Sequence, residues 1–73
     1  MHYTILEIQL FKNGTYASIK YDKDTKVEME QTYHEKLMYA AASGNTIKYH
    51  SIVVLDEKGE WYKGETYDHS EEN

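Results

Sequence analysis

Residues 33–43 read YHEKLMYAAAS, and this stretch predicts the helix around which the chain is organised. Apolar residues recur at helical spacing through Val27, Tyr33 and Leu37. The alanines near its end are the strongest helix formers, and their small side chains let another backbone approach closely. We therefore expect one helix, with a two-stranded unit on either side of it.

The residues that flank this stretch predict where the helix begins and ends. Asp24 and Thr25 are both capping residues, so the helix is expected to begin near one of them. At the other end Gly44 precedes Asn45, and glycine supplies the left-handed backbone that ends many helices. The predicted helix therefore ends at this Gly-Asn pair.

The segment before the helix predicts a β-hairpin. Residues 4–12 alternate with a period of two, which is typical of a half-buried strand. Asn13-Gly14 follows, and it is a strong hairpin signal because both residue types accept the positive φ of a type I′ turn. A two-residue loop then fixes the register, with three predicted pairs: Lys12 with Thr15, Ile8 with Ile19, and Glu7 with Lys20.

A second hairpin is predicted after the helix. Residues 46–55 are extended and largely apolar on both faces, and residues 56–59, DEKG, predict a type I turn with Gly59 in the left-handed region. Glu60 is then expected opposite Asp56. The further predicted pairs are Leu55 with Trp61, Val54 with Tyr62, Val53 with Lys63, and Tyr49 with Tyr67, with a bulge at Gly64.

The predicted order is ββαββ, an α+β fold in which two antiparallel hairpins flank one helix. Together they are expected to form a four-stranded antiparallel sheet with the helix on one face. A chain of 73 residues buries only about 60% of its unfolded surface, so we expect a single domain at 1–69 and a flexible polar tail at 70–73. The other face would be open, with an aromatic patch that includes Tyr3, Phe11 and Tyr16.

The composition excludes several classes of protein. The chain has 13 acidic and 8 basic residues and a formal charge of −5, which argues against direct nucleic-acid binding. It has no cysteine, and therefore no disulfide or thiolate metal site. No apolar run approaches the roughly 20 residues that span a bilayer, so we expect a cytoplasmic protein without membrane contact. Eight tyrosines favour an interface or a ligand pocket, unless they only fill a small sheet.

Polar and aromatic side chains from three elements form the candidate ligand-binding site. These residues are Tyr33, His34, His50, Glu65, Tyr67 and His69. Three histidines match the ligand count of a hydrolytic zinc site, but they lack any local metal spacing and are better explained as packed or interface residues. We therefore expect no metal and no cofactor.

No catalytic residue is predicted. Ser43 and Ser51 have no glycine elbow, and each glycine in the chain is isolated, which argues against a phosphate-binding loop. The sequence therefore favours a protein that is not an enzyme.

Several short motifs resemble those of small uncharacterised proteins of phages and prophages of Gram-positive gut bacteria. The motifs are YHxxLxxAA from Tyr33, HS at His50, DExG from Asp56 and ExYxH from Glu65. This resemblance implies a viral or mobile-element origin and a compact α+β fold, and it supplies no catalytic residues.

Two function classes follow from these observations. The first is a non-enzymatic binding module, most simply a homodimer formed through a sheet face or through the helix surface at 33–42. In the host cell such a module would inhibit host defence, either by blocking a host protein or by sequestering a nucleotide-like ligand. The alternative is a structural or accessory phage protein with no small-molecule ligand.

Overall fold

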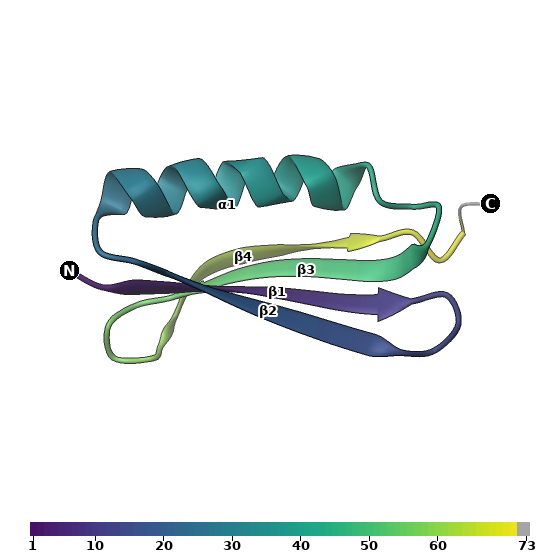
Figure 1. The fold of residues 1–73 in the computed structure, drawn as a ribbon, viewed down its shortest axis with the longest axis horizontal. Coiled ribbons are helices and arrows are strands. Elements are labelled where there is room, and N and C mark those ends of the chain that lie inside the picture. Colours follow the sequence, from purple (N-terminus) through teal and green to yellow (C-terminus); the bar gives the residue numbers. More distant parts are fainter. Residues whose placement is uncertain (72–73) are drawn as a thin grey trace.

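In the part of the chain that the structure describes, four antiparallel strands form one sheet, and one helix lies along one of its faces (Figure 1). The structure is a computed structural model, and it describes residues 1–71. Its elements are β1 (Tyr3–Phe11), β2 (Tyr16–Lys23), α1 (Lys26–Ala41), β3 (Ile47–Leu55) and β4 (Trp61–Asp68). The strand order is β2-β1-β3-β4, so the two hairpins meet along β1 and β3. The predicted ββαββ architecture is confirmed, and residues 72–73 of the predicted tail lie outside the described residues.

The helix begins as predicted and ends differently. Thr25 is the N-cap, and its hydroxyl oxygen accepts a hydrogen bond from the Glu28 backbone amide at 3.2 Å. The helix ends at Ala41 without a left-handed glycine, because Gly44 does not have a positive φ. Instead the Ser43 hydroxyl donates to the Ala40 carbonyl at 2.8 Å, which satisfies an end carbonyl that glycine geometry would otherwise serve.

The predicted register of the first hairpin is wrong by one residue. Ile8 lies opposite Ser18, because the loop has three residues and the Phe11 amide bonds the Thr15 carbonyl at 2.8 Å. Gly14 has a φ of +92°, but Asn13 keeps a negative φ, so a type I turn followed by a left-handed glycine replaces the type I′ turn. The Asn13 carboxamide oxygen accepts from the Thr15 amide at 3.0 Å and from its hydroxyl at 2.7 Å, which stabilises this longer loop.

The second turn is confirmed, but the pairing beyond it is not. The Asp56 amide donates to the Glu60 carbonyl at 2.9 Å, and Gly59 has a φ of +81°. Leu55 faces Trp61 as predicted.

Beyond this pair, Val54 faces Lys63, so Tyr62 is the extra residue of a bulge that was predicted at Gly64. Gly64 instead permits a close approach of strands, since a Cβ there would lie 2.9 Å from the Ile52 carbonyl oxygen.

The core lies between α1 and the sheet. Its buried cluster consists of Tyr3, Ile5, Met29, Tyr33, Ala40, Ile52 and Val54. The expected open-face position of Tyr3 is therefore wrong: only 4% of the residue is exposed, and its ring packs edge-on against Tyr62 beneath the helix. Tyr16 does lie on the far face, where it is opposite Leu10 and exposed.

Candidate functional site

The six predicted site residues lie around α1 and the helix side of β3 and β4, but they are divided between buried and exposed positions. Tyr33, His50 and His69 are buried, and Tyr67 is half-buried with its ring stacked on His69 at a centroid distance of 6.3 Å. Glu65 is exposed. His34 is also exposed and contacts Glu30 one helical turn away, at 3.1 Å.

The end of α1 brings two of the three predicted histidines together. His50 Nδ1 lies 3.0 Å from the Ser43 hydroxyl oxygen, and that hydroxyl donates to the Ala40 carbonyl. His69 Nε2 lies 2.8 Å from the same carbonyl oxygen. His34 is not part of this cluster. Within residues 1–71, no group of three or more His, Cys, Asp or Glu side chains is placed to hold a metal ion.

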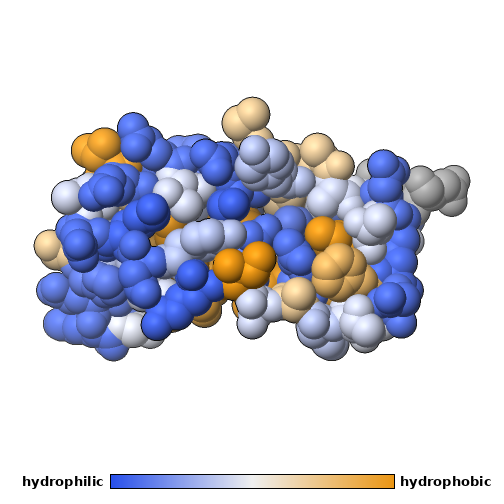
Figure 2. Space-filling model, viewed as in Figure 1, coloured by the Kyte–Doolittle hydropathy of each residue, from blue (hydrophilic) through white to orange (hydrophobic). Residues whose placement is uncertain are grey.

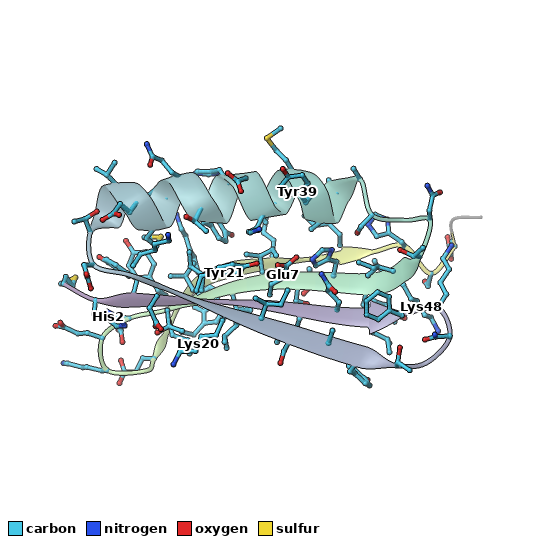
Figure 3. All side chains as sticks on the ribbon, viewed as in Figure 1. His2, Glu7, Lys20, Tyr21, Tyr39 and Lys48 are labelled. Atoms are coloured by element: carbon cyan, nitrogen blue, oxygen red, sulfur yellow. The ribbon has the colours of Figure 1, made fainter. Side chains whose placement is uncertain are left out.

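Glu7 is the central residue of the cluster, and the sequence did not reveal it. Its Oε2 accepts hydrogen bonds from His50 Nε2 at 2.7 Å and from Gln9 Nε2 at 3.0 Å, and its Oε1 accepts from the Tyr21 hydroxyl at 3.0 Å. Glu7 and Tyr21 point into the layer between the sheet and α1, whereas Lys20 points away from it (Figure 3). The predicted Glu7–Lys20 pair is therefore wrong, and Ile19 lies opposite Glu7.

The surroundings of Glu7 favour its ionised form. Burial alone raises the pKa of a carboxyl group, but hydrogen bonds from His50, Tyr21 and Gln9 outweigh this effect and lower the pKa of Glu7. The Lys36 ammonium lies over the Tyr21 ring, 4.8 Å from its centroid. Hydrogen bonding to Tyr21 also raises the pKa of Lys36, so a cation stands near the buried carboxylate.

Ser43, His50 and Glu7 are the residue types of a hydrolytic triad, but their setting favours a structural role. His50 is only 2% exposed, so a substrate has little access to its ring. Ser43 lies at the C-terminal end of α1, where carbonyl groups carry partial negative charge and would repel a developing oxyanion. We interpret the cluster of Glu7, His50 and Ser43 as a structural hydrogen-bond network that joins β1, β3 and the last turn of α1.

An ion pair lies between α1 and β4. Lys63 Nζ contacts Glu30 Oε1 and lies 4.7 Å from the centroid of the Tyr33 ring. The hydrogen bond from Lys63 lowers the pKa of Glu30, while burial and the nearby charge of Glu65 raise the pKa of Tyr33. These contacts occupy the helix side of β4, where a ligand of Tyr33 and Glu65 was expected.

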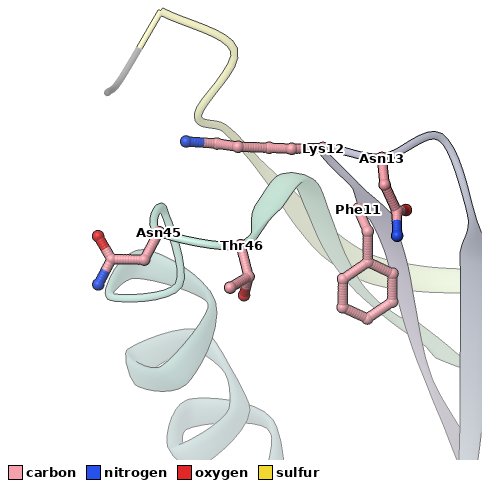
Figure 4. A pocket seen from close by; sticks show the side chains of 5 residues that line it. All are labelled: Phe11, Lys12, Asn13, Asn45 and Thr46. Carbon is pink, nitrogen blue, oxygen red and sulfur yellow. The ribbon is translucent and has the colours of Figure 1, made fainter.

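A hollow lies beside the loop of the first hairpin. It has a volume of about 510 Å³ and is open to solvent (Figure 4). Its lining residues are Phe11, Lys12, Asn13, Asn45 and Thr46. None of them belongs to the predicted site, so the predicted residues and the hollow are separate features.

The sheet face away from α1 carries a second group of apolar side chains outside the core. We define the open face by six side chains of the two central strands: Leu6, Ile8, Leu10, Tyr49, Val53 and Leu55. Ile8 is 38% exposed and the other five are half-buried. Side chains of the neighbouring strands cover them from the sides, but α1 packs on the opposite face and leaves their tips accessible. On the side of the molecule shown in Figure 2, by contrast, hydrophilic atoms predominate and hydrophobic atoms form scattered patches.

The alternation of β1 places Leu6, Ile8 and Leu10 on one side of the strand, but the open face was predicted on the opposite side, with Tyr3 and Phe11. The helix-side cluster has no such signal, because it depends on residues from three elements. Within residues 1–71, α1 is neither long nor apolar enough to cross a bilayer. Comparison of the chain with family models, curated proteins and solved structures found no match.

Proposed function

We propose that this chain is a small non-enzymatic binding module that recognises a protein surface through the open face of its sheet. The observation that carries the proposal is the position of Ile8 at the middle of an accessible apolar surface, with Leu6 and Leu10 on either side of it along β1. Such surfaces on small domains are typical of protein contacts.

The distribution of chemical groups supports binding over catalysis. Glu7 and His50 are buried and hydrogen-bonded to each other. The Ser43 hydroxyl is hydrogen-bonded to His50 and to the Ala40 carbonyl of α1. The open face, in contrast, presents mainly aliphatic side chains and the Tyr49 ring from the central strands, with the hydroxyl groups of Thr4 and Ser51 among them. A surface of this kind gains free energy by excluding water, and it offers few groups that would transfer a proton or an electron pair.

The proposed biological task follows from the resemblance to phage and prophage proteins. Such a module would inhibit host defence in the cytoplasm of the infected cell, either by blocking a protein or by sequestering a ligand. In the alternative task, the open face would join the chain to another phage protein as a structural or accessory component. The identity of the contacted protein distinguishes the two.

Site-specific photo-crosslinking tests the proposal. A benzoylphenylalanine placed at Ile8 is expected to give one discrete adduct when the chain is expressed in a Gram-positive host. The same probe at Val27, which is 67% exposed on α1, is the matched control and should give none. The adduct partner is identified by mass spectrometry, and Leu10→Lys should abolish the adduct. Equal labelling from both positions, or none from either, would contradict the proposal.

A further inference from the structure

We infer that the protein surface which the open face fits is that of a second copy of this chain, in a two-fold symmetric, face-to-face dimer. This inference rests on the proposed function and names its partner. In such a dimer the two sheets are stacked and the two α1 helices lie on the outside, so the assembly has four layers.

The charges of the face match this partner. On the side away from α1, the residue pairs from Thr4–Leu55 to Leu10–Tyr49 at the centre of the sheet are uncharged, and the ammonium of Lys48, near the end of β3, lies 5.5 Å from the centroid of the Tyr49 ring. Charges of both signs lie around this centre: Lys20 and Asp22 on β2, with Nζ and Oδ2 3.9 Å apart, Asp68 on β4, and Lys48 at the end of β3. The chain as a whole carries a formal charge of −5, but little of that charge faces the centre of the sheet. Two copies therefore meet through neutral centres with polar rims, which is the usual anatomy of an interface.

The size of the face is sufficient for a dimer. Its strands have eight or nine residues. With strands about 4.8 Å apart and about 3.3 Å per residue, four of them cover about 500 Å². This footprint is roughly a tenth of the 4811 Å² surface of one copy. Two copies would bury about 1,000 Å², which is near the lower limit for a specific interface, so we expect a dimer of micromolar affinity.

The polar groups of the face are compatible with burial against a copy of itself. Ser51 and Thr66 face each other across β3 and β4, and their hydroxyl groups are 2.7 Å apart, so each already has a hydrogen-bond partner. Tyr16 on β2 and Trp61 on β4 are exposed at opposite edges. Aromatic side chains with a polar tip suit such rims, because one end is dry and the other reaches water.

Sedimentation velocity of the purified chain across micromolar concentrations tests this inference. We expect the mass to rise from 8.6 kDa toward twice that value. Ile8→Lys should raise the dissociation constant about 100-fold, because it places a charge at the centre of the interface. Val27→Lys, the matched control on α1, should leave the constant unchanged. Far-UV circular dichroism establishes that each variant is folded, and Leu10→Thr provides a milder second variant of the face.

The outcomes separate the dimer from the proposed function. A wild-type mass that stays at 8.6 kDa, together with an Ile8 adduct to a different protein in cells, overturns the dimer and leaves the binding function standing. A constant monomer mass with no Ile8 adduct overturns both. A dimer that survives Ile8→Lys and Leu10→Thr but is lost with Val27→Lys places the interface on α1 and refutes the inference.

Discussion

His50 Nε2 lies 2.7 Å from Glu7 Oε2, and this contact joins β3 to β1 beneath the last turns of α1. Both side chains are almost fully buried, so the pair depends on its further hydrogen bonds. Tyr21 and Gln9 supply these on the Glu7 side, and Ser43 supplies one on the His50 side. The pair therefore connects three strands with the end of the helix.

Removal of the Glu7 charge is expected to destabilise the fold strongly. In Glu7→Leu, the buried donors of His50, Tyr21 and Gln9 lose their acceptor, and the free energy of unfolding should fall by about 3 kcal/mol. Urea denaturation measures this change. Glu35→Leu, at an exposed helix position, is the control and should differ from the wild type by less than about 0.5 kcal/mol. Similar losses in both variants would show that the pair has no special role.

The same carboxyl group predicts how stability depends on pH. The pKa of Glu7 in the fold lies below its ordinary value of 4.5, so the ionised form stabilises the fold at neutral pH. This contribution is lost as the pH falls below 4.5 and through the folded-state pKa. In Glu7→Gln the decrease in unfolding free energy between pH 6 and pH 3 should be smaller than in the wild type. Parallel curves for the two proteins would contradict the prediction.

The Ser43 hydroxyl is predicted to hold the end of α1. Ser43→Ala removes contacts with the Ala40 carbonyl and with His50 Nδ1, and it should cost about 1–2 kcal/mol of unfolding free energy. Amide hydrogen exchange should accelerate in the last turn of α1 more than elsewhere. Ser18→Ala, at an exposed position of β2, is the matched control. Unchanged exchange at the helix end would refute this role.

Gly64 is predicted to be required for the approach of β4 to β3. A Cβ at this position would lie 2.9 Å from the Ile52 carbonyl oxygen and 3.1 Å from the Val53 Cα, both of which are backbone atoms. Gly64→Ala should therefore lower the thermal midpoint, with a loss of about 1–3 kcal/mol from strand displacement. Glu60→Ala, one residue before β4 and exposed, should have a smaller effect. A neutral Gly64→Ala variant would mean that the strands separate without cost.

The sequence predicted the elements of this fold better than their pairing. Local features specify the Thr25 cap and the turn at Asp56, because each depends on a few adjacent residues. The register of the first hairpin depended on whether Asn13 would adopt a positive φ, and its side-chain bonds to Thr15 favoured the longer loop. One residue of difference moved the partner of Glu7 from Lys20 to Ile19.

The cluster of Glu7, His50 and Ser43 could not be predicted from the sequence, for a different reason. Glu7 and His50 are 43 residues apart, and they meet only because β1 and β3 are neighbours in the sheet. The strand order was not available from the pattern of either hairpin. His50 and His69 were identified as candidates from residue type alone, whereas Glu7 was paired with Lys20 in an incorrect register.

Isotope-filtered NMR on a mixture of labelled and unlabelled chains tests the central claim most directly, since it detects only contacts between copies. We predict intermolecular methyl contacts among Leu6, Ile8, Val53 and Leu55, with none from Val27 or Met38 on the exposed side of α1. Intermolecular contacts confined to Val27 and Met38, or no intermolecular contacts at millimolar concentration, would contradict the assignment of the open face as the surface where two copies of this chain meet.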